Sequence, residues 1–233
     1  MRAQDQAPTL SWVVPMFRTR DYLESLCARA LAAAQSLQLT CEMVLVDDAC
    51  PDGSASLAQQ LAKTYPIQVV RLNNNQGQDA AILAGLRVCR GRWALILDGD
   101  LQDPPEALAA LWPLTTEYDA VFAARFGNYE SRARLISSRL YRRCMELAGG
   151  LPPRAGLFVL ISRTLIERLG RARSSHPSIL ALIASARGRY ISVPVERAAR
   201  PAGRSSYGAG KRLRKGLLSL SQTVAARYFG MRL

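Results

Sequence analysis

Two aspartates separated by one glycine, Asp98 and Asp100, directly follow the apolar run 94–97. Such a run is typical of a buried strand in a parallel sheet, and ligands of open α/β sheets bind beyond the carboxyl ends of the strands. Two carboxylates this close repel each other unless a cation lies between them, and Mg²⁺ and Mn²⁺ take oxygen ligands and bridge to phosphates. The spacing therefore predicts a metal–diphosphate site, although Asp-x-Asp segments also occur as caps in ordinary loops.

The first hundred residues alternate between short apolar runs and segments with helical periodicity. This order predicts right-handed βαβ units and a parallel sheet in an α/β fold. Asp21 is the expected N-cap of the first helix. We expect strands over 11–15, 43–46, 67–72, 93–97, 120–124, 157–161 and 190–195, and helices after Asp21, after Ser54, over 78–87, in the arginine-rich segment around 132–143, and from Lys211.

The composition is that of a folded globular chain, with 233 residues, 49% hydrophobic and 21% charged. The five cysteines have no CxxC spacing, so we expect reduced thiols in a cytosolic compartment and no zinc site. A single histidine, His176, argues against histidine triads and multi-histidine metal centres. We expect neither a signal peptide nor a segment that spans a bilayer.

The net charge of +13 is unevenly distributed along the chain. Residues 117–233 hold 22 of the 31 Lys and Arg residues but only 6 of the 18 Asp and Glu residues. Such asymmetry predicts a polyanionic partner, namely nucleic acid, an anionic membrane or a phosphorylated substrate, or else a solvated basic face. Arginine predominates over lysine, which favours phosphate binding. Because the basic residues are not interleaved with aromatic ones in a known binding motif, we expect no nucleic-acid partner.

Four motifs occur in order along the chain, and a weaker fifth follows. The motifs are Val-Val-Pro-Met-Phe at 13–17, Val-Asp-Asp-Ala-Cys-Pro-Asp-Gly-Ser at 46–54, Asn-Gln-Gly-Gln-Asp-Ala-Ala at 75–81, Leu-Asp-Gly-Asp-Leu-Gln-Asp-Pro-Pro-Glu at 97–106, and Arg-Pro-Ala-Gly-Arg-Ser-Ser-Tyr at 200–207. With these motifs the sequence resembles the family-2 inverting glycosyltransferases of the GT-A fold, and more closely the polyprenyl-phosphate (dolichyl- or undecaprenyl-phosphate) glycosyltransferases. The resemblance implies a Rossmann-like, mostly parallel sheet flanked by helices.

The resemblance implies a binding site for a UDP- or GDP-sugar donor. Asp98 would face the sugar and ribose, while Asp100, with Gln102, would bind Mg²⁺ or Mn²⁺ at the diphosphate. Asp47, Asp48 and Asp52 alternatively only cap turns, and Gly77 alternatively only caps a helix. The remaining donor-side residues implied are Pro15 and Phe17 at the nucleotide pocket, Asp47 or Asp48 at the base or ribose, Gly77 and Asp79 in the third motif, and Arg200 and Ser205 in a loop over the donor phosphates.

The acceptor implied by the resemblance is a polyprenyl phosphate. A phosphate oxygen is already ionised at neutral pH, so it needs positioning and charge compensation rather than a strong base. The resemblance implies Arg125, Arg134 and Ser138 as the acceptor-side residues, and forked guanidinium donors suit phosphate. The neighbouring arginines at 132, 139, 142 and 143 are expected on a solvated helix face or at a membrane.

One segment departs from the family pattern. Many relatives carry Asp-Phe-Arg where this chain has Leu157-Phe158-Val159, so a potential base and a potential phosphate ligand are replaced by apolar residues. Two alternative functions remain open for this reason. One is transfer to a glycan hydroxyl, which would need Asp103 or Glu106 as the base. The other is a catalytically silent nucleotide-sugar-binding subunit of a membrane complex.

The expected domain organisation is a glycosyltransferase domain over 1–210 and a basic amphipathic C-terminal helix over 211–233. A basic amphipathic helix is typical of membrane-surface elements, although it also fits an ordinary packed helix. We therefore expect a cytoplasmic protein, peripheral on the inner face of the membrane, with an anionic membrane surface among its partners. Homo-oligomer formation is left open.

Overall fold

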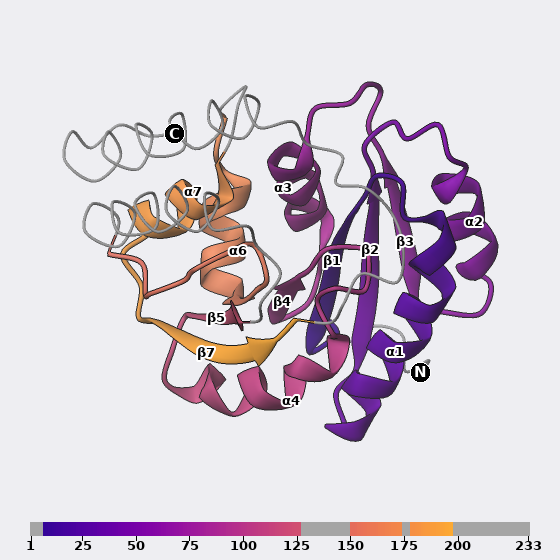
Figure 1. Ribbon diagram of the computed structural model, residues 1–233. Coiled ribbons are helices and arrows are strands. Elements are labelled where there is room, and N and C mark those ends of the chain that lie inside the picture. Colours follow the sequence, from indigo (N-terminus) through magenta and orange to yellow (C-terminus); the bar gives the residue numbers. More distant parts are fainter. Residues whose placement is uncertain (1–6, 127–149, 174–177, 198–233) are drawn as a thin grey trace.

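The computed structural model describes residues 7–126, 150–173 and 178–197. Their strands form one seven-stranded sheet in the order β3-β2-β1-β4-β6-β5-β7 (Figure 1). Neighbouring strands are parallel except at β6, which is antiparallel to both β4 and β5. The strands are β1 (Leu10–Met16), β2 (Cys41–Asp47), β3 (Ile67–Arg71), β4 (Trp93–Ile96), β5 (Ala120–Phe126), β6 (Val159–Ser162) and β7 (Tyr190–Glu196).

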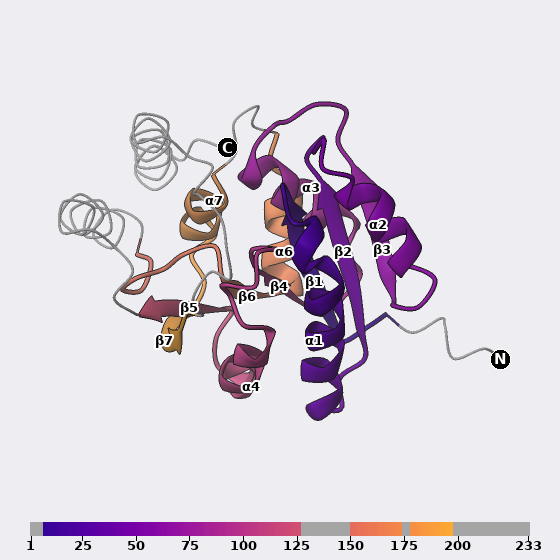
Figure 2. The same cartoon turned by 45° about the vertical axis from the view of Figure 1, so that its right-hand side comes forward.

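Helices cover both faces of this sheet and divide its core in two. One core, around Trp12, lies under α1, α2 and α4, and the other, around Ile82, lies under α3, α6 and α7. Figure 2 shows β5 and β7 side by side at the end of the sheet away from β3. The helices are α1 (Leu23–Ser36), α2 (Ser54–Leu61), α3 (Gln78–Val88), α4 (Leu108–Leu111), α6 (Arg163–Gly170) and α7 (Ile179–Ser185).

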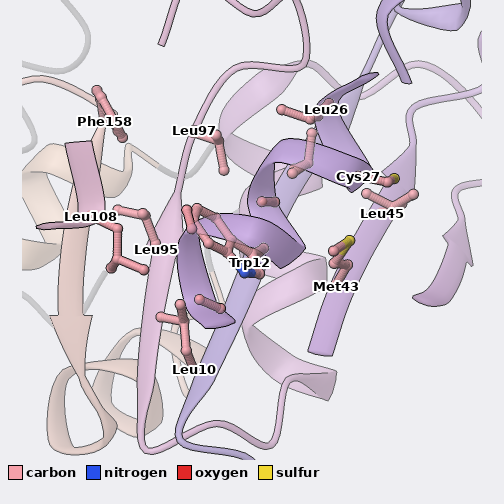
Figure 3. Close-up of a cluster of buried hydrophobic side chains, with 14 of the residues drawn as sticks. Leu10, Trp12, Leu26, Cys27, Met43, Leu45, Leu95, Leu97, Leu108 and Phe158 are labelled. Carbon is pink, nitrogen blue, oxygen red and sulfur yellow. The ribbon is translucent and has the colours of Figure 1, made fainter. Parts of the chain in front are cut away.

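The central strand β1 supplies side chains to both cores. Trp12 and Val14 belong to the Trp12 core, whereas Val13 belongs to the Ile82 core, as the period of two in a strand requires. Figure 3 shows Trp12 among Leu10, Leu95 and residues of α1 and β2. Because β1 is buried on both faces, its sequence from Trp12 to Met16 is a continuous apolar run rather than an alternating one.

The expected strands and their parallel order in the first hundred residues are confirmed, but the cap of the first helix is wrong. A short 3₁₀ turn, Arg20–Tyr22, contains Asp21, and α1 begins after it at Leu23. The N-cap, Tyr22, makes no side-chain capping bond. The helical segments expected around 132–143 and from Lys211, and hence the domain 211–233, lie outside the described residues. Within the described ranges, no helix combines the length and apolar character needed to cross a bilayer.

Unusual backbone conformations occur in the loops after β1, β2 and β4. Arg18, Ala49 and Leu101 have φ angles of 58°, 52° and 59°, in the left-handed region that residues other than glycine seldom adopt. Each loop leaves the carboxyl end of a parallel strand, so all three lie at the same edge of the sheet. Strained backbone of this kind persists where the surrounding structure enforces it, and it clusters at ligand sites.

The opposite, amino edge is held by a buried carboxylate. Glu42 in β2 accepts hydrogen bonds from Ser11 Oγ (2.7 Å), from the backbone N–H of Arg90 (2.5 Å) and from Arg90 Nε (3.0 Å). Ser11 in turn accepts the backbone N–H of Gly91 at 2.8 Å. These bonds join β1, β2 and the turn into β4. They fix the amino edge of the sheet, at the end opposite the loops after β1, β2 and β4.

Replacing Glu42 by alanine is expected to destabilise the protein by about 2–3 kcal/mol, because the variant loses hydrogen bonds to a charged group and leaves Ser11 without its acceptor. Chemical denaturation of Glu42→Ala measures this loss. Glu117→Ala, which removes an exposed carboxylate, is the control and should change the free energy of unfolding much less. Equal effects of the two substitutions would contradict the anchoring role of Glu42.

Candidate functional site

The loop after β4 folds back on itself and carries the Asp-Gly-Asp motif. The backbone N–H of Asp98 donates to Asp103 Oδ2 at 3.3 Å, and that of Gln102 donates to Asp100 Oδ1 at 3.2 Å. Gly99 lies against Thr19, and a Cβ at Gly99 would approach Thr19 Cγ2 to 2.8 Å. The glycine between the two aspartates is therefore required by the close approach of the loop after β1.

Asp98 is held by side chains from two other elements. Gln78 Nε2, at the start of α3, donates to Asp98 Oδ1 at 2.5 Å, and Arg125 Nη2, near the end of β5, donates to Asp98 Oδ2 at 3.1 Å. Both carboxylate oxygens thus have donors. The loop after β4, the start of α3 and the end of β5 meet at this one side chain, as predicted for carboxyl ends of parallel strands.

Arg125 is shared between two carboxylates. The nitrogen that contacts Asp98, Nη2, also forms an ion pair with Asp103 Oδ2. Burial raises the pKa of the fully buried Asp103 carboxyl, and the charge of Arg125 only partly reverses this increase. Burial lowers the pKa of Arg125, but the charges of Asp103 and Asp98 more than reverse this, so its pKa is raised and the guanidinium stays charged.

These contacts bear on the two residues considered as bases for a hydroxyl acceptor. Asp103 has no exposed surface and is occupied by Arg125. Glu106 binds Arg29 of α1 through both oxygens, at 2.8 and 2.7 Å. Arg29 lowers the pKa of Glu106, which makes it a weaker base. Both carboxylates are thus paired with arginines.

A second arginine, Arg197, reaches the loop after β4, and sequence reasoning missed it. It directly follows β7, and its Nη2 donates to Gln102 Oε1 at 2.6 Å. Its Nε is buried with no hydrogen-bond partner, and within the described part of the chain Arg197 forms no ion pair. The basic residues that follow strand 190–196 were the sequence signal for Arg197. Its position beside Gln102 depends on the pairing of β7 with β5, which the sequence pattern does not show.

The acidic pair after β2 organises two loops. Asp48 is buried and its two oxygens accept the backbone N–H groups of Gln76 (2.7 Å) and Gly77 (2.9 Å). Asp47 is also buried and accepts the backbone N–H of Cys50 at 3.0 Å. Gly77, with φ 89°, is the N-cap of α3. The carboxylates thus stabilise the loops at the edge, and their contact with a base or ribose remains a prediction.

Asp52 fits its capping alternative. Its oxygens accept the backbone N–H and hydroxyl of Ser54, at the start of α2, and the backbone N–H of Arg20. Asp79 is buried, and its Oδ1 accepts the backbone N–H of Ile179 at 3.1 Å. That contact joins α3 to α7, so Asp79 supports the helix that carries Gln78.

The aromatic ring predicted at the nucleotide pocket is exposed at the carboxyl edge. Phe17 is 39% exposed, and the guanidinium of Arg18 lies 5.6 Å from its ring centroid. Pro15 is a buried residue of β1 two positions earlier. An exposed ring at a ligand edge gives a flat surface on which a nucleotide base can stack.

The two apolar replacements lie at the start of β6. Val159 pairs with Ile96 of β4 and Phe122 of β5, and its side chain is fully buried in the Ile82 core. Leu157, two residues earlier, is half-buried and packs against the same core. Because β6 is antiparallel, its amino end lies at the same edge as the carboxyl ends of β4 and β5. Leu157 thus places an apolar side chain at the edge that carries Asp98 and Arg125.

The oxygens of the loop fit Mg²⁺ or Mn²⁺ that is held mainly by phosphates and water. Such ions take one or two carboxylates plus substrate phosphates rather than a cage of protein ligands. Consistently, the residues that the structure describes contain no cluster of three His, Cys, Asp or Glu side chains suited to a metal. Asp98 already has donors on both oxygens. The candidate ligands are Asp100 and the amide oxygen of Gln102, although both already accept hydrogen bonds, from the backbone of Gln102 and from Arg197 respectively. Arg134, Ser138, Arg200 and Ser205 lie outside the described residues.

Two solved structures illustrate the similarity in fold. Glucosyl-3-phosphoglycerate synthase from Mycobacterium tuberculosis, in complex with Mn²⁺, UDP-glucose and phosphoglyceric acid, aligns with a TM-score of 0.66 and 14% identity over 94% of this chain and 79% of its own. A mannosyltransferase from Pyrobaculum calidifontis, in complex with GDP-mannose and Mn²⁺, aligns with a TM-score of 0.58 and 20% identity over 95% of this chain and 70% of its own. The fold is the GT-A fold expected from the sequence.

Sequence comparison gives the family. Residues 11–170 match glycosyl transferase family 2, and the chain belongs to that family. Curated relatives include the undecaprenyl-phosphate 4-deoxy-4-formamido-L-arabinose transferases of Pseudomonas fluorescens (strain Pf0-1) and Edwardsiella ictaluri (strain 93-146), each 32% identical over 85% and 87% of this chain. The chain spans 60% and 64% of the lengths of these two relatives.

Asp48 offers a test of the organisation of this edge. Asp48→Ala removes the acceptor of two backbone N–H groups, so we expect a loss of about 2–3 kcal/mol in the free energy of unfolding without any ligand present. Denaturant unfolding measures it, with the exposed Asp21→Ala as the control. If Asp48 served only to contact a ligand, Asp48→Ala would unfold at the same denaturant concentration as the unsubstituted protein.

Proposed function

We propose that the protein transfers a sugar, with inversion at the anomeric carbon, from a nucleotide-diphosphate donor to a polyprenyl phosphate. The observation that carries this proposal is the arrangement at the carboxyl edge, where the Asp98–Asp103 loop lies beside two guanidinium groups, Arg125 and Arg197, from β5 and β7. Membership of glycosyl transferase family 2 and the undecaprenyl-phosphate relatives support it.

The donor occupies the half of the edge formed by β1, β2 and β4. Asp100 and Gln102 would hold Mg²⁺ or Mn²⁺, which would supply Lewis-acid stabilisation of the diphosphate leaving group. Phe17 stacks on the base, and Asp47 or Asp48, with Pro15, lines the nucleotide pocket. Asp98 faces the sugar and ribose from a position held by Gln78. The donor-side set is completed by Gly77 and Asp79 and by Arg200 and Ser205 of the motif at 200–207.

The acceptor approaches from the half formed by β5, β6 and β7. A phosphate nucleophile needs no strong base, which agrees with the engagement of Asp103 and Glu106 by arginines and with the apolar side chain of Leu157. Its negative charge requires compensation, which guanidinium forks supply. Arg125, with Arg134 and Ser138, binds the acceptor phosphate. Arg197 is added to this set, because within the described residues its charge has no carboxylate partner.

The remaining proposals concern where the protein works and what it contacts at the membrane. A polyprenyl phosphate is embedded in a bilayer, so the protein works as a peripheral protein on the cytoplasmic face. The basic segment 211–233 contacts anionic lipid there. Association of two or more copies at the membrane is compatible with this arrangement.

One alternative is favoured by a specific observation. Val159 is part of the core and Leu157 is apolar, so both side chains that many relatives use at the acceptor are replaced. A silent nucleotide-sugar-binding subunit would retain donor binding and lack transfer. An assay of sugar transfer therefore distinguishes the enzyme from the silent subunit.

The test is transfer of radiolabelled sugar from UDP- and GDP-sugars to polyprenyl phosphate in detergent, with and without Mn²⁺. We expect metal-dependent formation of a lipid-linked sugar with an inverted anomeric configuration. Asp100→Asn should lower turnover by about 100-fold or more, since changes to groups that merely support metal ligands already cost 10–100-fold.

The control for this substitution is Asp119→Asn, which alters a carboxylate at the amino edge, where it accepts the backbone N–H of Arg189. It should leave turnover unchanged. Unaltered turnover of Asp100→Asn in Mn²⁺ would contradict the metal role, and donor binding without any transfer would favour the silent subunit.

A further inference from the structure

Asp103 has no part in the proposed chemistry, yet its contacts all lead to groups that do. Its carboxylate is fully buried, which is costly for a charged group unless it is paired. Its Oδ2 accepts the backbone N–H of Asp98 at 3.3 Å and forms the ion pair with Arg125. Through one oxygen, Asp103 thus contacts the loop on the donor side and the guanidinium on the acceptor side.

The ion pair with Asp103 matters because Arg125 contacts two carboxylates. Its Nη2 contacts Asp98 and Asp103 together, and 29% of its side chain remains exposed. Without the charge of Asp103, the guanidinium would be attracted by Asp98 alone. It would then settle on Asp98 and leave its place opposite the acceptor.

We propose that Asp103 is a positioning residue, which holds Arg125 at a fixed place between the donor and acceptor halves of the site and closes the loop that carries Asp98. This inference rests on the proposed function. Asp103 directly follows Gln102 in this chain, so the same short loop holds both side chains. Preorganisation of this kind affects catalysis because groups must be held close to the productive geometry before substrate binds.

Asp103→Asn removes the negative charge of residue 103 but keeps an acceptor for the backbone N–H of Asp98, which closes the loop. The amide keeps a carbonyl oxygen for the backbone N–H of Asp98 and nearly the same volume, but it loses the charge that faces Arg125. We expect kcat for transfer to fall by about 10–100-fold. The affinity for the nucleoside diphosphate with Mn²⁺, measured by calorimetry, should change by less than about threefold, because Asp100 and Gln102 are retained.

A matched control lies three residues along the chain. Glu106→Gln also removes a carboxylate that pairs with an arginine, Arg29, but that pair lies outside the site. It should leave both kcat and nucleotide affinity unchanged. If Asp103 had only a structural role, Asp103→Asn would lower nucleotide affinity and thermal stability together, without a selective loss of kcat.

The coupling to Arg125 gives a second readout. In an Arg125→Gln background, Asp103→Asn should lower kcat by less than about twofold, because residues in one ion-pair network are not additive. Denaturation midpoints should be non-additive in the same way, and they remain measurable if Asp103→Asn is too unstable to assay. Independent, additive effects on both quantities would overturn the inference. Absence of transfer by the unsubstituted protein would instead contradict the proposed function, and the midpoints would then still test whether Asp103 holds Arg125.

Discussion

The ion pairs of Arg125 with Asp98 and Asp103 join the two halves of the sheet at its carboxyl edge. Arg125 reaches this point from β5, whereas both aspartates follow β4, and β6 lies between these strands. β6 begins with the apolar residue Val159, and the guanidinium contacts both carboxylates directly. The single guanidinium of Arg125 lies against two carboxylates, Asp98 and Asp103, so a net negative charge remains on the loop. That charge suits a divalent ion and the diphosphate that accompanies it.

The two edges of the sheet have different physical roles. At the amino edge, Glu42 satisfies donors from β1, β2 and the turn into β4, and this fixes where the strands start. At the carboxyl edge, the loops after β1, β2 and β4 contain left-handed residues and buried carboxylates that hold backbone N–H groups. Strain at one edge is maintained by packing and hydrogen bonds elsewhere in the fold. The result is a set of loops preorganised around the Asp98 carboxylate.

Much of the proposed donor half was predictable from the sequence because it is local. The apolar run 94–97 and the two aspartates after it indicate a strand that leads directly into an acidic loop, and the structure has β4 followed by that loop. The proposed acceptor half depends on strand order, which periodicity does not encode. The contact of Arg197 with Gln102 requires the parallel pairing of β5 with β7, and the engagement of Asp103 by Arg125 requires β6 to run in reverse. Asp21 was mispredicted as a cap because a 3₁₀ turn precedes α1.

The central claim is that the carboxyl edge binds a nucleoside diphosphate together with a divalent metal ion. The most direct test is the thermal unfolding of the protein with UDP, GDP and their common sugars, each with and without Mn²⁺. A ligand at about 100 times its dissociation constant adds about 2.7 kcal/mol to the stability of the folded state. The account predicts a Mn²⁺-dependent rise in melting temperature with one nucleotide. No rise with any nucleotide, or the same rise without metal, would contradict it.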